Sequence, residues 1–324
     1  MQQVFLFNAE RLKTEAQCLG FSACGVSAAG DVDRQHSAAF TKWLDSGKNG
    51  CMEYMARNSD KRLDPCQLLP GAKSVISVAL NYYPSEKIES NHLQFAYYAY
   101  GKDYHDVMRN RLRQLAHSLG IYDVRDENKE NNGTTSQWRG LACCDTVPIL
   151  DRYWAWKSGI GWIGRNTSLI IPGLGSFCFL GEIITELEFD HYDSPMEDRC
   201  GKCTRCLEAC PCNALEPYTL DARRCLSYLT IESHDEIPDE SASKMGQYIY
   251  GCDRCQLACP HNAKPHPTDV SEFKPSPELL SMTYSDWRAL SKSQYDQLFK
   301  GSAVKRAKYD GLMRNIKAIY DQKP

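Results

Sequence analysis

Several common features are missing from this chain of 324 residues. It has no long hydrophobic run, because its longest apolar stretch, residues 169–184, is interrupted by Pro172, Gly173 and Gly175 and is too short to span a bilayer. No basic start and apolar core mark residues 1–7 as a secretory signal. The net charge of −3 argues against a generally basic protein that coats nucleic acid. We therefore expect a cytoplasmic protein that does not enter a membrane.

Two nucleotide-binding signatures are also missing. No G-x-G-x-x-G fingerprint follows a predicted strand, so a Rossmann site for nicotinamide or flavin is not supported. No G-x₄-G-K-[ST] loop is present to bind phosphates. Residues 159–168 are glycine-rich and could bring the backbone against a large ligand. A turn packed against a strand accounts for them equally well.

Cysteine, by contrast, is abundant, with 16 in the chain. Residues 200–211 spell C-x₂-C-x₂-C-x₃-C-P, the run that bacterial ferredoxins use to hold iron–sulfur clusters. Its fourth cysteine is expected to ligate a second cluster, which requires another cysteine group. Residues 252–260 provide one, C-x₂-C-x₃-C-P, although Ile249 stands where its first cysteine would be. The missing ligand must come from elsewhere, and Cys225 is the candidate.

Exchange of the last cysteines between the groups predicts two four-thiolate sets, each holding one [4Fe–4S] cluster. The first set is Cys200, Cys203, Cys206 and Cys259, and the second is Cys210, Cys225, Cys252 and Cys255. Structural zinc also uses C-x₂-C pairs, but it has no use for the C-x₃-C-P ending. Disulfides would need an oxidising compartment, and unligated buried thiols are a third alternative. The spacing favours clusters.

Short helices and strands alternate before the cysteine region. Asn8 can cap a helix that runs to about residue 19, and a second helix is predicted over residues 103–119. Strands are predicted at residues 21–26, 72–81, 141–144, 169–171 and 176–187. Residues 284–320 are predicted to be helical again. These patterns predict an α+β protein.

Two residues invite a chemical interpretation. Asp145 follows a predicted apolar strand, where burial would raise the pKa of its carboxyl and let it act as a general acid. An Asx turn at the strand end is the structural alternative. His105 could be a ligand or a proton donor, and a capping or solvated histidine at a helix start is the more usual case.

Several segments together resemble epoxyqueuosine reductases, a cobalamin-dependent family related to reductive dehalogenases. The similarity extends in order over nearly the whole chain. Besides the cysteine region it includes residues 69–78 (LPGAKSVISV), 100–105 (YGKDYH), 145–152 (DTVPILDR), 159–167 (GIGWIGRNT), 225–232 (CLSYLTIE) and 301–315 (GSAVKRAKYDGLMRN).

The resemblance implies a fold, an activity and cofactors. The expected fold is a nitroreductase-related cobalamin-binding domain at residues 1–190, a ferredoxin-like two-cluster domain at 191–265 and a short C-terminal helical segment at 266–324. The expected activity is reduction of epoxyqueuosine to queuosine at the wobble position of tRNA, with electrons passing through two [4Fe–4S] clusters to cobalamin. A ferredoxin-like electron-transfer protein and a dehalogenase of small organohalides are the alternatives. A monomer served by an external electron donor is expected.

The resemblance also implies site residues. Asp145 matches the family's proton donor and a cobalamin contact, which favours the catalytic interpretation over the Asx turn. The other expected cobalamin contacts are Arg57, His105, Gly164, Arg165, Asn166, Thr167 and Ser168. The basic C-terminal stretch is expected to meet tRNA phosphates through Lys305, Arg306, Lys308, Arg314 and Lys317, with a solvated helix face as the alternative.

Overall fold

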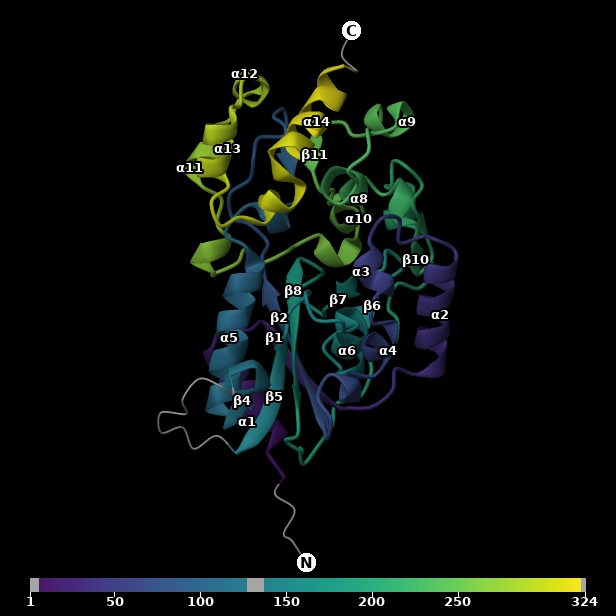
Figure 1. Cartoon of the computed structure of the whole chain (residues 1–324), viewed down its shortest axis with the longest axis vertical. Helices are drawn as coiled ribbons and strands as arrows, with labels where there is room; N and C mark the ends of the chain where they lie inside the picture. The colour runs from purple at the N-terminus through teal and green to yellow at the C-terminus, as the bar shows by residue number, and fades with distance from the viewer. Residues whose placement is uncertain (1–5, 127–136, 322–324) are drawn as a thin grey trace, which may run out of the picture.

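A five-stranded sheet lies at the centre of the first half of the chain (Figure 1). The computed structural model describes residues 6–126 and 137–321. The strand order is β1-β2-β8-β5-β4, with antiparallel pairing except between β5 and β4. The strands are β1 (Ala23–Ala28), β2 (Ser74–Asn81), β4 (Ile121–Asp123), β5 (Trp138–Cys143) and β8 (Cys178–Thr185).

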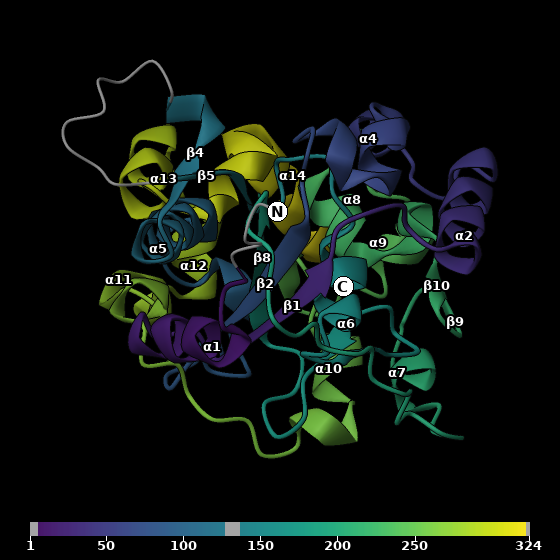
Figure 2. The same cartoon turned by 90° about the horizontal axis from the view of Figure 1, so that it is seen from below.

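Helices cover both faces of this sheet, which Figure 2 shows from below. The helices α1 (Ala9–Cys18) and α5 (Tyr104–Ser118) pack on one face, and α6 (Asp151–Lys157) packs on the other. Every residue of β2 is buried, as expected for a central strand with both faces covered. Asn8 caps α1, and its side chain accepts a hydrogen bond from the Arg11 amide. The predicted helices at 8–19 and 103–119 and the predicted strand at 72–81 are confirmed.

Shorter elements extend the layer on the α6 side. They are α2 (Arg34–Asp45), α3 (Glu53–Ala56), α4 (Ser59–Leu63), η1 (Pro65–Gln67), β6 (Trp162–Ile163) and β7 (Leu169–Ile170), and the last two strands form a hairpin. The remaining short elements before the cysteine region are β3 (Gln94–Phe95), η2 (Tyr97–Ala99) and η3 (Val124–Asp126).

The cysteine region is built from very short elements, because its ligand spacing leaves little room for long ones. They are α7 (Arg205–Glu208), β9 (Leu215–Glu216), β10 (Thr219–Leu220), η4 (Ala222–Arg224), α8 (Leu226–Ile231), α9 (Asp239–Ala242), β11 (Tyr248–Tyr250), α10 (Arg254–Leu257) and η5 (Pro260–Asn262). The strand β11 pairs in parallel with β3, which ties this region to the first half of the chain.

The C-terminal stretch is helical with interruptions, as predicted for residues 284–320. Its elements are η6 (Ser271–Phe273), α11 (Pro277–Ser281), α12 (Tyr284–Arg288), α13 (Lys292–Leu298), η7 (Ala303–Ala307) and α14 (Lys308–Tyr320). A second hydrophobic core joins these helices to the cysteine region and to β3. Trp287, for example, lies 5.3 Å from Phe95 between ring centroids.

The α+β architecture is therefore confirmed, whereas the domain boundaries at residues 190 and 265 stay a prediction. The outer ends of the first and third predicted segments, residues 1–5 and 322–324, lie outside the described residues. In the described ranges, no helix combines the length and the apolar character needed to cross a bilayer.

Candidate active site and cluster sites

Asp145 lies at the end of β5, where the chain leaves the sheet. Its φ of +58° is in the left-handed region, which costs free energy for any residue with a Cβ and is tolerated best by Asp and Asn. Two neighbours from the start of α5 contact its carboxyl. The Tyr104 hydroxyl donates to Oδ2 at 2.5 Å, and Nε2 of His105 lies 3.3 Å from the same oxygen. The sequence expectation that Asp145 and His105 both belong to a site is consistent with this contact.

His105 bridges two carboxylates. Its Nδ1 lies 2.7 Å from Oδ1 of Asp103, the residue that also caps α5, while Nε2 faces Asp145. Burial lowers the pKa of His105, but the hydrogen bonds to both carboxylates outweigh it and raise the pKa to about 9. His105 is therefore a cation at neutral pH.

The electrostatics of Asp145 differ from the sequence expectation. We expected burial to raise the pKa of its carboxyl and keep it protonated. Burial does raise the pKa, but hydrogen bonds from His105 and Tyr104 and the charge of His105 outweigh it and hold the pKa below the usual value. The side chain is also 62% exposed. In this conformation the proton resides on His105, and Asp145 is its carboxylate partner.

Tyr54 and Arg306 interact electrostatically with Asp145. The Tyr54 ring on α3 is 43% exposed, and burial together with the charges of Glu232 and Asp145 raises its pKa to about 12. The Arg306 guanidinium lies 5.7 Å from the centroid of that ring. Arg306 also forms a paired salt bridge with Glu232, at 3.0 and 2.7 Å. A tyrosine and an arginine thus lie within electrostatic range of the Asp145 carboxylate.

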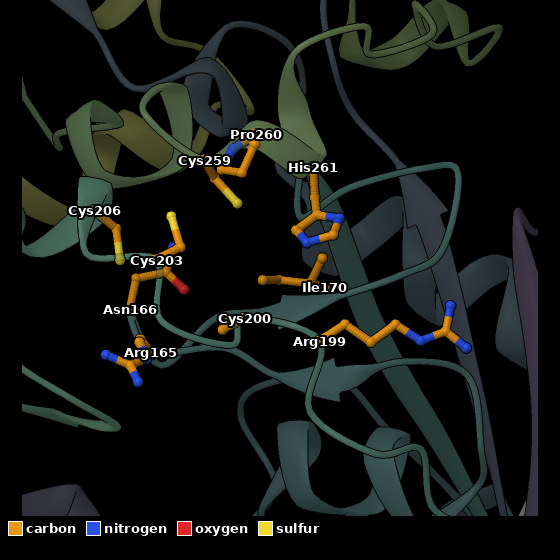
Figure 3. Close-up of a pocket in the computed structure, with 10 residues that line it drawn as sticks. All are labelled: Arg165, Asn166, Ile170, Arg199, Cys200, Cys203, Cys206, Cys259, Pro260 and His261. Atoms are coloured by element: carbon orange, nitrogen blue, oxygen red, sulfur yellow. The ribbon is translucent and has the colours of Figure 1, made fainter.

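The first predicted cysteine set lines a cavity of about 80 Å³ (Figure 3). Its four members, Cys200, Cys203, Cys206 and Cys259, come from the two separate cysteine groups and surround the same space. The remaining lining residues are Arg165, Asn166, Ile170, Arg199, Pro260 and His261. Two residues of the glycine-rich 164–168 segment therefore contact this cysteine cavity.

Hydrogen-bond donors surround these sulfur atoms. The Arg165 amide and the Trp162 indole N–H lie near the Cys200 sulfur, where they oppose the rise in pKa that burial causes, although neither forms a hydrogen bond of ordinary geometry with it. Within the described residues, Trp162 Nε1, Arg165 Nε and Asn166 Nδ2 are buried without a hydrogen-bond partner in the protein. Such orphaned donors suit the sulfur atoms of a cluster, whose charge and potential are set partly by N–H···S contacts.

The second predicted set is also brought together. Burial raises the pKa of the Cys255 thiol, and Cys252, Cys225 and Cys210 raise it further through their charge, so these four side chains are neighbours. The amide of Ala214 donates to the Cys210 sulfur at 3.2 Å. Among the described residues, no three ligand side chains are close enough to bind a single metal ion.

Other predicted residues fare differently. Arg57 lies exposed at the end of α3, and no side-chain hydrogen bond joins it to Asp145 in the described structure. Thr167 has a φ of +66° in the β6–β7 turn, which closes with a hydrogen bond from the Gly164 amide to the Ser168 carbonyl. The turn interpretation of this segment is therefore confirmed, and its contact with the cysteine cavity shows that it also reaches a candidate ligand site.

The basic C-terminal residues divide into two kinds. Lys305, Lys308 and Lys317 are exposed. Arg314 instead donates to the backbone carbonyls of Leu229, Ser233 and Asp235 around the end of α8. These hydrogen bonds join α14 to the end of α8, and a tRNA contact of Arg314 stays a prediction.

Comparison with known proteins identifies the family. The family model described as "Epoxyqueuosine reductase QueG, DUF1730" matches residues 62–146, and a "4Fe-4S double cluster binding domain" matches residues 199–262. An epoxyqueuosine reductase of Cellulophaga algicola is 43% identical over 312 residues, which cover 95% of this chain and 97% of that protein. The chain belongs to the epoxyqueuosine reductase family. It is therefore an oxidoreductase with two iron–sulfur clusters, and the electron-carrier and dehalogenase alternatives are set aside.

Solved epoxyqueuosine reductases have the same fold. One, in complex with an epoxyqueuosine-modified tRNA-Tyr stem loop, superposes with a TM-score of 0.82 at 31% identity, covering 96% of this chain and 80% of that one. Another, from Bacillus subtilis, has a TM-score of 0.80 at 30% identity, with the same coverage of both chains. In that structure a catalytic loop, named after its aspartate, is swung out of the active site.

Three residues beside the site were missed from the sequence. Tyr104 has a signal, because it immediately precedes His105 at the predicted start of a helix. Glu182 and Asp151 lie behind the Asp145 loop, and Glu182 is hidden within the apolar run of residues 169–184. A single carboxyl residue within an apolar run gives no sequence signal of a site, because its neighbours from other segments are known only from the fold.

Proposed function

We propose that this protein reduces epoxyqueuosine to queuosine in tRNA, with Asp145 delivering a proton to the oxygen that leaves. The contact of Asp145 with His105 and Tyr104 is the observation that supports the proposal most directly. Loss of the epoxide oxygen as water consumes two electrons and two protons. The two clusters supply a route for electrons, and the Asp145 site supplies a proton.

The proton chemistry follows from the charge of each group. His105 holds a proton at neutral pH, and its Nε2 lies 3.3 Å from Oδ2 of Asp145. When an alkoxide develops next to Asp145, the proton can pass from His105 through the carboxyl to the oxygen. Tyr104 fixes the carboxyl by donating to the same oxygen. Asp103 anchors the far side of the imidazole and keeps Nε2 aimed at Asp145.

Cobalamin is the proposed organic cofactor, and the open face beside Asp145 fits it. The exposed Tyr54 ring offers a flat apolar surface for a macrocycle, and the neighbouring Asp145 and Arg306 side chains offer polar contacts for its amide rim. We propose that His105 and Asp145 contribute to this site, together with Arg57 and residues 164–168 as the family resemblance implies. Cobalamin, when bound there, would supply a strongly reducing metal centre for the loss of the epoxide oxygen.

The crossed cysteine sets are our proposed cluster ligands. The cavity shared by Cys200, Cys203, Cys206 and Cys259 supports the first set, and the mutual influence of Cys210, Cys225, Cys252 and Cys255 supports the second. Replacing Cys225 with Ser should remove about half of the bound iron and sulfide. Cys212→Ser is the control, because Cys212 is buried nearby and lies outside both sets. Equal iron content in the two variants would overturn the second set.

The proposed tRNA contact comprises Lys305, Lys308 and Lys317, with Arg306 at the edge nearest Asp145. A contact from Arg314 stays a prediction. Neutralising Lys305 and Lys308 together should weaken tRNA binding and flatten its salt dependence, because each phosphate contact contributes roughly 0.9 to the slope of log K against log salt for a duplex. An unchanged slope would exclude this surface. We also propose that the protein acts in the cytoplasm as a monomer served by a separate electron donor.

Nucleoside mass spectrometry tests the function. The protein, reconstituted anaerobically with iron, sulfide and cobalamin and supplied with a chemical reductant, should convert epoxyqueuosine in tRNA to queuosine. Omission of cobalamin should abolish conversion while the clusters remain. Failure of the complete system to form queuosine, with both clusters present, would reject the proposed reaction.

A further inference from the structure

Glu182 is a fully buried carboxyl with no partner in the described structure. It lies in the middle of β8, between Ser77 on β2 and Cys143 on β5. Neither of its oxygens has a hydrogen-bond partner within ordinary geometry among the described residues. A buried, unpaired carboxylate is very unfavourable, and the group takes up a proton instead. Burial raises the pKa of Glu182 well above its usual range, and the charges of Asp151 and Asp145 raise it further.

The carboxyl that affects Glu182 most is Asp151, the first residue of α6. Its Oδ1 is also buried without a hydrogen bond in the described ranges. Burial and the charge of Asp145 raise the pKa of Asp151 to about 6. The Glu182 carboxyl and nearby backbone amides oppose this rise. Asp151 begins α6, directly after the Asp145 loop, and Glu182 pairs with Cys143 at the end of β5, directly before that loop.

Two arginines respond to the charge of Asp151, namely Arg62 on α4 and Arg152 on α6. Arg62 donates to the backbone carbonyls of Ile149 and Tyr54, each at 3.1 Å, and Arg152 donates to the carbonyl of Thr167. In the described part of the chain neither forms a salt bridge with Asp151 or Glu182. The thiols of Cys143 and Cys144 face the same carboxyls, and burial raises the pKa of both, so they add no charge.

We propose that neutral Glu182 donates a hydrogen bond to Asp151 and that this buried acid pair positions the Asp145 loop by joining its two ends, the end of β5 and the start of α6. The loop needs such support, because Asp145 is held in the left-handed region at φ +58°. Glu182 and Asp151 are therefore positioning residues for the proposed proton delivery. The expected effect on the reaction rate rests on the proposed function, whereas the hydrogen bond between the two acids does not.

Infrared spectroscopy tests the neutral state without any turnover. The holoprotein at pH 7 should show the carbonyl stretch of a protonated, buried carboxylic acid, which shifts slowly in D₂O. Glu182→Gln should remove this band. Glu186→Gln is the matched control, because Glu186 lies just beyond β8 and forms a salt bridge with Arg139 at 3.2 Å. A band that is absent from the wild type, or that persists in Glu182→Gln, would overturn the proposal even if the enzymatic function were confirmed.

A pair of neutral substitutions tests the positioning. Glu182→Gln keeps a donor for Asp151, whereas Glu182→Leu has similar size and no donor. We expect kcat to stay within about 2-fold of wild type for Gln and to fall at least about 10-fold for Leu, with KM little changed, because small displacements of a catalytic group have large effects on rate. Asp151→Asn, which loses the anionic acceptor for the Glu182 proton, should resemble Leu. Equal rates for Gln and Leu would assign Glu182 to packing and reject the proposal.

Iron content and circular dichroism show whether each variant is folded. A lower kcat is interpreted only for variants that keep the wild-type iron content and spectrum. The outcomes separate the two proposals. A wild-type enzyme that binds its cofactors but forms no queuosine rejects the proposed function, whereas the infrared result still decides whether Glu182 is neutral and bonded to Asp151. If neither Leu nor Asn can be obtained folded, persistence of the protonated-acid band in Glu182→Gln remains the outcome that rejects the pair.

Discussion

Carboxyl groups on the two sides of the Asp145 loop differ in charge, because Asp145 is ionised and Glu182 is neutral. On the open side, Asp145 is 62% exposed and receives hydrogen bonds from Tyr104 and His105, which hold its pKa below the usual value. On the buried side, Glu182 has no partner within hydrogen-bond geometry among the described residues, and burial raises its pKa. The two acids are nevertheless close in the fold, because Glu182 pairs with Cys143, two residues before Asp145. Partners, and not residue type, decide which acid is ionised.

The same comparison explains why the open side can do proton chemistry and the buried side cannot do it directly. His105 and Asp145 lie where a substrate can reach them, and a proton held between them can leave. Glu182 and Asp151 are enclosed by β2, β5, β8 and α6, so their proton stays in place and serves structure. A neutral acid that remains neutral is a good hydrogen-bond donor and a poor proton source.

The largest expected effect comes from removing the open-side acid. Asp145→Asn keeps the size of the side chain but cannot transfer a proton, so we expect turnover to fall by at least about 100-fold. Both clusters should remain bound, because Asp145 contacts neither cysteine set. Single-turnover conversion of epoxyqueuosine, followed by nucleoside mass spectrometry, measures the change.

Asp106→Asn is the control for that experiment. Asp106 also lies in the first turn of α5, but it is exposed and forms a salt bridge with Arg109 at 2.7 Å. Its turnover should match the wild type. If Asp145→Asn also turned over normally, Asp145 would be only a turn residue. The difference in charge between Asp145 and Glu182 would then have no role in catalysis.

A smaller effect should appear in the pH dependence of stability. The pKa of His105 is raised to about 9, above the value of about 6.5 in an unfolded chain. Its contribution is therefore fully present below about pH 6.5 and is lost as the pH rises through about 9. Solvent screens the exposed Asp145 partner, so we expect a loss of about 1 to 2 kcal/mol in the free energy of unfolding over that range.

Anaerobic denaturant unfolding of wild type and His105→Gln at pH 6 and pH 9.5 measures this loss. The variant should show a weaker pH dependence than the wild type, because its side chain does not titrate. His117→Gln, an exposed position in the last turn of the same helix, should keep the wild-type dependence. A variant at position 105 with an unaltered pH dependence would mean that His105 is not the cation paired with Asp145.

Much of this molecule could be predicted from its sequence, and the rest depended on contacts between distant segments. Asn8 and the apolar positions of α5 predict helices by local rules, and the β-branched residues of β2 predict a strand. The spacing also predicted that Cys259 joins the first cysteine group at one cavity, whereas the two ligand sets stay a prediction. The direction of the pKa shift of Asp145 was predicted wrongly, because it depends on Tyr104 and His105, which lie about forty residues away in the chain.

The smallest expected effect separates the two partners of Asp145. Tyr104→Phe removes the 2.5 Å hydrogen bond to Oδ2 but keeps the ring, which stacks on Phe179 at 4.3 Å and on His105 at 4.1 Å between centroids. A lost hydrogen bond worth about 1 kcal/mol to the ionised form should raise the pKa of Asp145 by somewhat less than one unit. The pH at which the Asp145 carboxylate band disappears, read from infrared difference spectra against Asp145→Asn, should move upward by that amount, while Tyr122→Phe on β4 leaves it in place. If this pH does not move, His105 alone sets the charge of Asp145, and the hydrogen bond from Tyr104 contributes nothing to it.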